Sequence, residues 1–300
     1  MNSSGSKGAP APPPADDVGP LESLASHAGL LIAAGFALYP VLWVVALALS
    51  TEQAPVPRVL PLPEQPTLAH FREVVGSART LADGTRLWLF GRQLGNSLVV
   101  AASAALAGIL IALPAAYALA RFEFVGKRAG VRSLLATQMF PAIASAVPLY
   151  MLLNALGLLN SRTGLVLSYA TTSVPFSIFQ LRAAFEAIPV DLEEAAMVDG
   201  ATRLEAFVRV VLPAARPAIA VTALFAFMSA YNEFILAATL LGKEEMYTLP
   251  VVLQRYIGEH DANWPAFAAG ALVVSAPVMA LFYLAQRHLV AGLTAGAVKG

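Results

Sequence analysis

Long apolar runs separated by short charged links are the feature of this 300-residue chain that most restricts its fold. Each run is close to the length of about 20 residues with which an α-helix crosses a ~30 Å hydrocarbon layer. The runs cover residues 27–50, 96–120, 133–156, 164–181, 218–241 and 266–285. Backbone groups in lipid must find partners within their own segment. The sequence therefore predicts an all-α membrane protein with six transmembrane helices.

The composition excludes several other classes of protein. The chain is 58% hydrophobic and 13% charged, whereas soluble domains are about 25% charged. Its net charge of zero lacks the basic excess of a nucleic-acid binder. It has no cysteine, and its four histidines lie far apart, without the spacing of metal ligands. We expect no nucleic-acid partner, no metal site and no enzymatic activity.

The charged links predict the orientation in the membrane. Basic residues near span ends favour the cytoplasm, and they concentrate after the second run and after the fourth. Both links, and hence both termini, should be cytoplasmic. The predicted organisation is a disordered cytoplasmic tail (1–24), a membrane domain (25–290) with an outer loop (51–95) and a cytoplasmic loop (183–217), and a cytoplasmic C-terminal tail (291–300).

The cytoplasmic loop predicts a first short helix. Asp191 can cap its start, with Glu194 as the third helical residue in a D-x-x-E arrangement. Leu192, Ala195 and Ala196 then share one face of the helix. Gly200 suits the left-handed conformation that ends a helix.

A second amphipathic helix should follow at once. Thr202 and Glu205 form another capping box, and Pro213 should stop the helix. Its apolar residues recur at helical spacing: Leu204, Phe207, Val208, Val211 and Leu212. The loop is therefore expected to fold as two short helices joined at Gly200.

Two environments are compatible with such helices. A basic amphipathic helix can lie on the membrane, with its arginines at the lipid headgroups. Residues 182–217, however, contain six acids and four arginines, which weakens attraction to anionic lipid. A protein partner is the favoured interpretation.

The same residues resemble the EAA loop of binding-protein-dependent ABC importers. The resemblance rests on Glu194-Ala195-Ala196, Gly200 four residues later, and the run from Val210 to Pro213. It implies the type I ABC importer permease fold, in the cell inner membrane. It also implies that a separate ATPase docks on the loop at Glu194, Ala195, Ala196, Gly200, Leu212 and Pro213.

The C-terminal residues 286–300 resemble those of carbohydrate-uptake permeases, closest to the smaller membrane subunit of the maltose transporter. In that relative the tail reaches between two ATPase subunits. The resemblance implies contacts to the ATPase from Gly292, Thr294, Gly296 and Lys299. Without it, this tail would be interpreted as a frayed terminus.

One acid falls within a predicted span. A carboxylate near the middle of the fifth run costs on the order of 3 kcal/mol to insert and should face the bundle interior. That acid is Glu233, and with Tyr231 and Asn232 it could line a substrate path. The alternative is a structural acid that is hydrogen-bonded to Asn232 or to another helix.

These inferences favour the permease subunit of an ATP-driven sugar importer, with maltose, maltodextrin or a related oligosaccharide as cargo. The chain lacks the G-x-x-x-x-G-K-[ST] phosphate loop, so we expect no cofactor of its own, with ATP bound by the partner. The expected partners are two copies of the ATPase, a second homologous permease, an extracytoplasmic sugar-binding protein and membrane lipid. A secondary transporter with Glu233 as a proton relay is the alternative.

Overall fold

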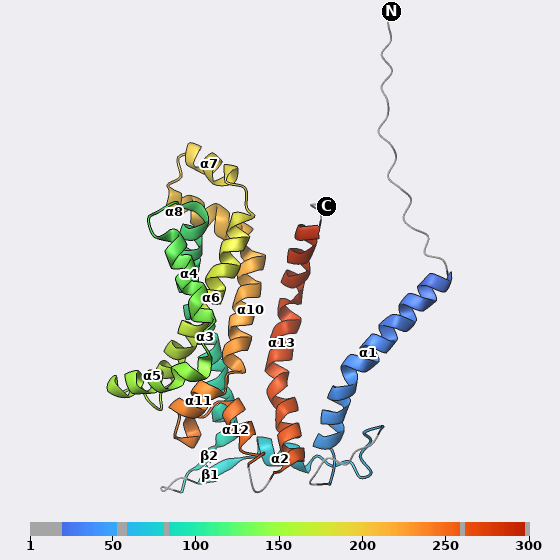
Figure 1. Ribbon diagram of the computed structural model, residues 1–300. Coiled ribbons are helices and arrows are strands. Elements are labelled where there is room, and N and C mark those ends of the chain that lie inside the picture. The colour runs from blue at the N-terminus through green and yellow to red at the C-terminus, as the bar shows by residue number, and fades with distance from the viewer. Residues whose placement is uncertain (1–19, 53–58, 81–83, 259–261, 298–300) are drawn as a thin grey trace, which may run out of the picture.

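The computed structural model describes residues 20–52, 59–80, 84–258 and 262–297. Within these ranges the chain is almost entirely helical (Figure 1), and the one sheet is a hairpin of β1 (Ala78–Thr80) and β2 (Arg86–Trp88). The prediction of an all-α membrane protein is confirmed. Of the predicted N-terminal tail, residues 1–19 lie outside the described ranges, and residues 20–24 already belong to the first helix.

Five long helices form the body of the molecule. They are α1 (Pro20–Ala48), α3 (Leu89–Arg121), α6 (Arg162–Glu186), α10 (Arg216–Tyr231) and α13 (Trp264–Ala297). Helices α3, α6 and α10 pack along one another, and α13 packs on α10. Helix α1 leans away and meets α13 only where the two helices approach α2 (Ala69–Val75) (Figure 1).

Small residues allow α3 and α6 to lie close together. A Cβ atom added at Gly108 of α3 would come within 2.8 Å of the Ser173 hydroxyl on α6. Ala101, Ala104 and Ala112 of α3 are buried as well. In lipid, close packing of small residues is a main source of helix association, so this stripe holds the centre of the bundle together.

The number of spans differs from the prediction. Among the described residues, three helices are long and apolar enough to cross a membrane, namely α1, α3 and α13. Two bent pairs would bring the number to five. Helix α6 is 25 residues long, but its hydroxyl-bearing residues make it less apolar than the others. The predicted count of six is therefore not confirmed.

The third predicted span is a bent pair rather than one helix. Helix α4 (Lys127–Gln138) ends before Pro141, and α5 (Ala142–Ala155) leaves it at an angle of 101°. Proline disfavours the helical conformation of the residue before it and lacks the N–H that would continue the helix. The predicted span over residues 133–156 is therefore bent at this proline, and it counts as one span only if the two helices cross the membrane together.

The fifth predicted span is also interrupted. Helix α10 ends at Tyr231, and α11 (Ile235–Leu240) begins after a three-residue break. Glu233 therefore lies in the break, not in the middle of a helix. This corrects the expected setting of the acid, and its hydrogen bonds explain why the break forms there.

The short elements gather at opposite ends of the bundle. At one end lie α2, the β-hairpin, the 3₁₀ turn η2 (Glu244–Met246) and α12 (Leu249–Gln254) (Figure 1). At the other end lie α7 (Asp191–Val198) and α8 (Arg203–Ala206). Helix α3 already begins at Leu89, so the predicted outer loop of residues 51–95 ends seven residues earlier than expected.

Candidate functional site

The most distinctive surface feature is the two-helix loop, residues 191–214, which stands beyond the end of α6 (Figure 1). Its first helix, α7, is not capped as predicted. The N-cap residue is Val190, and no side chain caps the helix. Backbone bonds from Glu193 and Glu194 to the Val190 carbonyl begin the helix, which makes Asp191 its first residue and leaves Glu194 without a capping role.

The end of α7 agrees with the prediction. Gly200 has a φ of +95°, in the left-handed region. Its N–H donates to the Met197 carbonyl, and the Ala201 N–H donates to the Ala196 carbonyl. These two bonds form a Schellman motif, which satisfies the last carbonyls of the helix and turns the chain sharply. Gly200 is thus a fixed corner between the two helices.

The second helix begins with the predicted capping box. The Glu205 N–H donates to the Thr202 hydroxyl, and the Thr202 N–H donates to the Glu205 carboxylate. The Thr202 backbone and hydroxyl bonds, with Arg209 nearby, hold the pKa of Glu205 below its usual range. The cap is therefore fully formed at neutral pH.

Pro213 does not stop this helix, contrary to expectation. The helix passes through a π turn, η1 (Phe207–Val211), continues as α9 (Leu212–Ala214) and ends at Ala215. A proline ring clashes with the carbonyl four residues earlier, and the wider π turn moves the preceding carbonyls away from it. The predicted apolar face is only partly buried, because Phe207 and Val211 are buried whereas Leu204 is 71% exposed.

The outer surface of the loop combines small and apolar residues. Glu194 and Ala195 are exposed and Ala196 is half-buried. Large apolar side chains lie exposed beside them: Leu192, Val198, Leu204 and Val208. A compact apolar patch on a rigid, charged projection is typical of a protein-binding surface. The structure thus brings the four predicted residues of α7 and its corner onto one projection, with Leu212 and Pro213 at its base.

The buried root of this loop is not predicted by any local sequence pattern. The Glu193 side chain is only 5% exposed and accepts hydrogen bonds from Arg121 Nε at 2.5 Å and from the Tyr117 hydroxyl at 2.7 Å. Arg121 also donates to the Ile188 carbonyl at 2.9 Å. Arg121 follows the second apolar run, where a basic residue predicts only the orientation in the membrane, and no local pattern links it to an acid 72 residues away.

An aromatic cluster packs around the same root. The Tyr117 ring lies 4.3 Å from that of Phe207 and 6.3 Å from that of Phe185, centroid to centroid. These rings belong to α3, η1 and α6, and all three side chains are buried. The loop is therefore anchored to two long helices by both polar and aromatic contacts.

The break between α10 and α11 holds the predicted path residues. The two Glu233 carboxylate oxygens accept the N–H groups of Leu236 and Ala237, at 2.9 and 3.1 Å. The Tyr231 hydroxyl donates to the Val274 carbonyl of α13 at 3.0 Å. Tyr231 is buried by helix packing, whereas Asn232 is exposed and Glu233 is half-buried. Glu233 thus holds the first amides of α11, and this structural bond does not decide between the two predicted roles of the acid.

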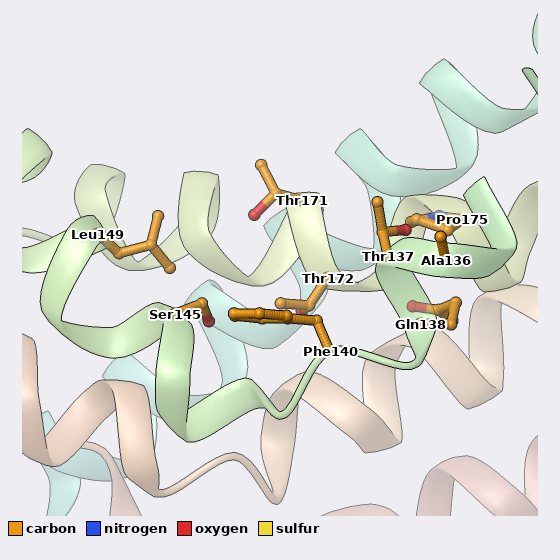
Figure 2. A pocket seen from close by; sticks show the side chains of 9 residues that line it. All are labelled: Ala136, Thr137, Gln138, Phe140, Ser145, Leu149, Thr171, Thr172 and Pro175. Carbon is orange, nitrogen blue, oxygen red and sulfur yellow. The ribbon is translucent and has the colours of Figure 1, made fainter. Parts of the chain in front are cut away.

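A cavity of about 780 Å³ lies where α4 bends into α5 against α6. Figure 2 shows hydroxyl, amide and aromatic side chains around it. Its lining residues are Ala136, Thr137, Gln138, Phe140, Ser145, Leu149, Thr171, Thr172 and Pro175. None of the predicted path residues lines it. No sequence signal pointed to it, because the bend at Pro141 creates it.

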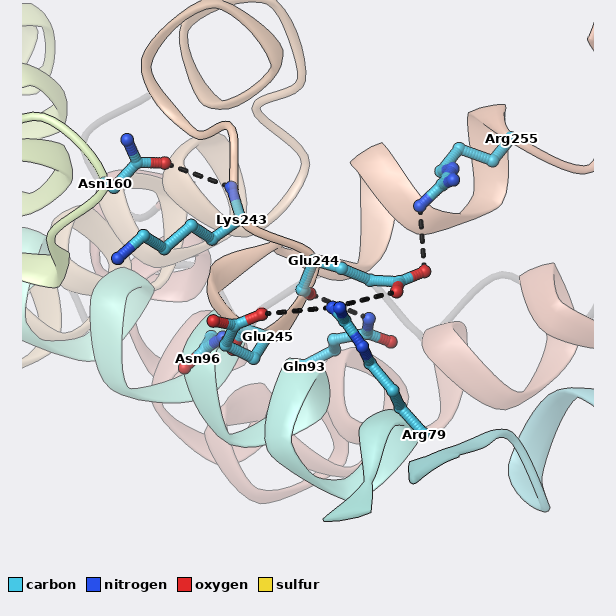
Figure 3. Close-up of polar contacts among 8 residues, drawn as sticks. All are labelled: Arg79, Gln93, Asn96, Asn160, Lys243, Glu244, Glu245 and Arg255. Carbon is cyan, nitrogen blue, oxygen red and sulfur yellow. Dashed lines mark hydrogen bonds and ion pairs between the residues drawn. The ribbon is translucent and has the colours of Figure 1, made fainter. Parts of the chain in front are cut away.

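A polar network fastens the opposite end of the bundle (Figure 3). Asn96 of α3 is fully buried and donates to the Glu245 and Tyr247 carbonyls. Asn160 accepts from the backbone N–H groups of Gly242 and Lys243. Arg79 and Arg255 approach the carboxylate of Glu244, which precedes Glu245 in η2. The loop after α11 is thus held as a rigid surface.

The predicted contact residues of the C-terminal tail do not form a separate segment. Helix α13 continues to Ala297, so Gly292, Thr294 and Gly296 belong to its backbone. Lys299 lies outside the described residues. The C-terminal end of α13 lies toward the same end of the molecule as the two-helix loop (Figure 1).

Apolar helices that carry a rigid projection at one end define a membrane-embedded component that offers a docking surface. Residues 104–295 match the family described as the binding-protein-dependent transport system inner membrane component. The chain therefore belongs to this family of ABC importer permeases. It is a transport component of the inner membrane and not an enzyme.

Several relatives align over nearly the whole chain. The trehalose transport system permease protein SugB of Mycobacterium tuberculosis is 36% identical, over 89% of this chain and 94% of its own. The maltose/maltodextrin permease protein MalG of Salmonella typhimurium is 35% identical, over 93% and 97%. A bacterial ABC transporter that imports alginate has a similar chain, with a TM-score of 0.71 and 25% identity, over 92% of this chain and 99% of that one.

Proposed function

We propose that this chain is the permease subunit of an ATP-driven sugar importer and that its two-helix loop receives a separate ATPase. The observation that carries the proposal is the geometry of that loop. The Gly200 corner and the Thr202–Glu205 box fix its two helices, while Glu194 and Ala195 remain exposed. A loop built in this way can transmit force to the bundle, whereas a slack loop cannot.

The docking residues have distinct roles in this proposal. Ala195 and Ala196 allow a partner helix or cleft wall to approach the α7 backbone closely. Glu194 offers an exposed charge to a basic residue of the ATPase. Gly200 sets the angle of α7, and Leu212 and Pro213 form the base on which the loop stands. This end of the bundle, with both termini, then faces the cytoplasm.

A second, homologous permease is proposed because one chain does not enclose a path. Helix α1 has a broadly exposed apolar surface, and so does α5, where Ile143, Val147 and Met151 are each about 65% exposed. Surfaces of this kind are covered by lipid or by another membrane subunit. Two permeases would present two docking loops and hence bind two copies of the ATPase.

The network of Asn96, Asn160 and Glu244 supports an extracytoplasmic binding protein as a further partner. It holds the loop after α11 in one shape, and a preformed surface loses less entropy when a protein binds. The alginate importer has been solved together with its periplasmic protein.

The cargo is proposed to be a sugar, and more narrowly a maltodextrin or a related oligosaccharide. The cavity at the α4–α5 bend combines four hydroxyl groups and the Gln138 amide with apolar side chains such as Phe140, a mixture that suits a sugar (Figure 2). The relatives are named for trehalose, maltodextrin and galactooligosaccharides, among others. Asn232 and Glu233 remain proposed path residues, since Glu233 is only half-buried.

The proton-relay alternative is not favoured. Both carboxylate oxygens of Glu233 accept backbone N–H groups at the start of α11, a structural role that a proton relay does not require. The family also consists of ATP-coupled importers rather than proton-coupled transporters.

Reconstitution with the candidate ATPase, second permease and binding protein tests the proposal. ATP hydrolysis should rise when binding protein loaded with maltodextrin is added, and labelled sugar should enter the vesicles only with ATP. A panel of maltodextrin, trehalose and galactooligosaccharide tests the narrower assignment. Uptake that an uncoupler abolishes and that does not need ATP would overturn the importer function.

A further inference from the structure

We propose that Glu193, Arg121 and Tyr117 form a coupling root, a buried group of positioning residues that makes the docking helix α7 move together with the membrane helix α3. The inference rests on the proposed function of the two-helix loop. It goes further in naming the contact through which a force on that loop enters the membrane bundle.

Glu193 and Glu194 lie on different faces of α7. They are adjacent in the sequence, yet Glu193 is buried and Glu194 is exposed. Successive residues of an α-helix point about 100° apart, so one turn of α7 presents an outward and an inward carboxylate. The outward one is available to a partner, and the inward one is bonded to α3.

Arg121 connects three parts of the chain. It is the last residue of α3, it pairs with Glu193 of α7, and it donates to the Ile188 carbonyl between α6 and α7. Its side chain is only 6% exposed. A buried ion pair with these additional bonds resists separation, because parting it would leave an uncompensated charge in an apolar setting. The α7 helix cannot shift without drawing the end of α3 with it.

Tyr117 extends the contact by one helical turn. Its hydroxyl donates to the second Glu193 oxygen, and its ring packs on Phe207 and Phe185. Both carboxylate oxygens of Glu193 are therefore held by α3, four residues apart along that helix. Two contacts at this spacing constrain the orientation of α7 as well as its position.

The chain offers a matched control pair. Arg182 and Glu186 of α6 also form an Arg–Glu bond, at 2.7 Å, but their side chains are 27% and 45% exposed and lie on a single helix. This pair bridges no two elements. Substitutions in the Arg182–Glu186 pair also remove an Arg–Glu bond near this end of the bundle, but they leave the coupling root intact.

The first test compares Glu193→Gln with Glu186→Gln in the assembled transporter. Both variants should retain the wild-type amount of ATPase, because Glu194 and Ala195 are untouched. In Glu193→Gln, ATP hydrolysed per sugar imported should rise about fivefold or more, in the usual range of site-to-site coupling, and Tyr117→Phe should show a smaller rise. An unchanged ratio in assembled Glu193→Gln complexes would overturn the proposal. If the wild-type permease did not bind the ATPase at all, the docking function itself would be contradicted.

The second test measures the motion directly. The chain has no cysteine, so Val125→Cys and Asp191→Cys can carry spin labels at two exposed positions, beyond the end of α3 and at the first residue of α7, outside the proposed docking residues. The distance between the labels should stay constant with and without ATP in the otherwise wild-type transporter. It should broaden or shift in the Glu193→Gln background. A distance that changes equally in both backgrounds would show that α7 moves independently of α3.

Discussion

Arg162 Nε donates a 2.9 Å hydrogen bond to Asn96 Oδ1, which ties the first turn of α6 to α3 at the end of the bundle opposite the two-helix loop. The same Asn96 side chain donates to two carbonyls of the loop after α11. One buried amide thus joins three segments that are far apart in the sequence.

Asn96→Ala should therefore destabilise the protein. It leaves the Arg162 guanidinium and two buried carbonyls without this partner, and an unsatisfied buried polar group costs about 1–3 kcal/mol. Thermal unfolding in detergent should show a clearly lower midpoint than for Asn154→Ala, which changes an exposed amide on α5. Equal midpoints for the two variants would contradict the role given to Asn96.

Glu194→Lys should release the ATPase while leaving the chain in the membrane. The substitution reverses an exposed charge at the centre of the proposed docking surface, where losing one anchor costs about 2 kcal/mol or more. The amount of ATPase that co-purifies is the measurement, with Glu123→Lys as control, an exposed acid next to the α3–α4 turn. Wild-type recovery of the ATPase with Glu194→Lys would count against the docking assignment.

Gly200→Ala should loosen the corner of the two-helix loop. A non-glycine residue in the left-handed region costs roughly 1–2 kcal/mol, and Gly200 has a φ of +95°. Hydrogen exchange at the end of α7 should become faster, and ATPase binding weaker. Gly130→Ala is the control, because Gly130 lies within α4 with open space around it and without a positive φ. Slower exchange in Gly200→Ala would be inconsistent with a strained corner.

Glu233→Ala should destabilise the break between α10 and α11. The carboxylate holds the first amides of α11, and hydrogen bonds to a charged group contribute about 1.5–3 kcal/mol. Glu233→Gln keeps one acceptor oxygen and should be affected less, with ATP-dependent uptake retained. Thermal unfolding and uptake with and without an uncoupler check this. Loss of uptake in a stable Glu233→Gln protein, together with wild-type uptake that an uncoupler abolishes, would support the relay interpretation instead.

Removal of residues 292–300 should reduce transport more than membrane insertion. The deletion takes away Gly292, Thr294, Gly296 and Lys299, which are proposed to contact the ATPase, and it leaves α13 long enough to span the membrane. Sugar uptake should be compared with the amount of protein in the membrane, and a deletion of residues 2–15 provides the control. Unchanged uptake would refute a working role for the tail.

Sequence patterns were most reliable where the interactions are local. The Thr202–Glu205 box and the Gly200 corner depend on bonds between residues at most five apart, so their residue types sufficed to predict them. The prediction that Asp191 caps α7 was wrong, because the Val190 carbonyl accepts the first hydrogen bonds of the helix. The prediction that Pro213 ends the second helix was wrong, because a π turn before it accommodates the proline ring.

The apolar runs, the helical class and the two-helix loop thus follow from the order of residues alone, because burial of apolar groups and local hydrogen bonding determine them. Pro141 and Glu233 have local effects at the bend and at the break, but Pro114 and Pro277 remain within continuous helices, so only the folded structure shows which proline bends the chain. The inward turn of Glu193 required the folded structure, since Arg121 and Tyr117 lie more than 70 residues away in the sequence. Contacts between residues so far apart produce no periodic pattern in the sequence. Only the packing of α3 beside the loop brings these three side chains together.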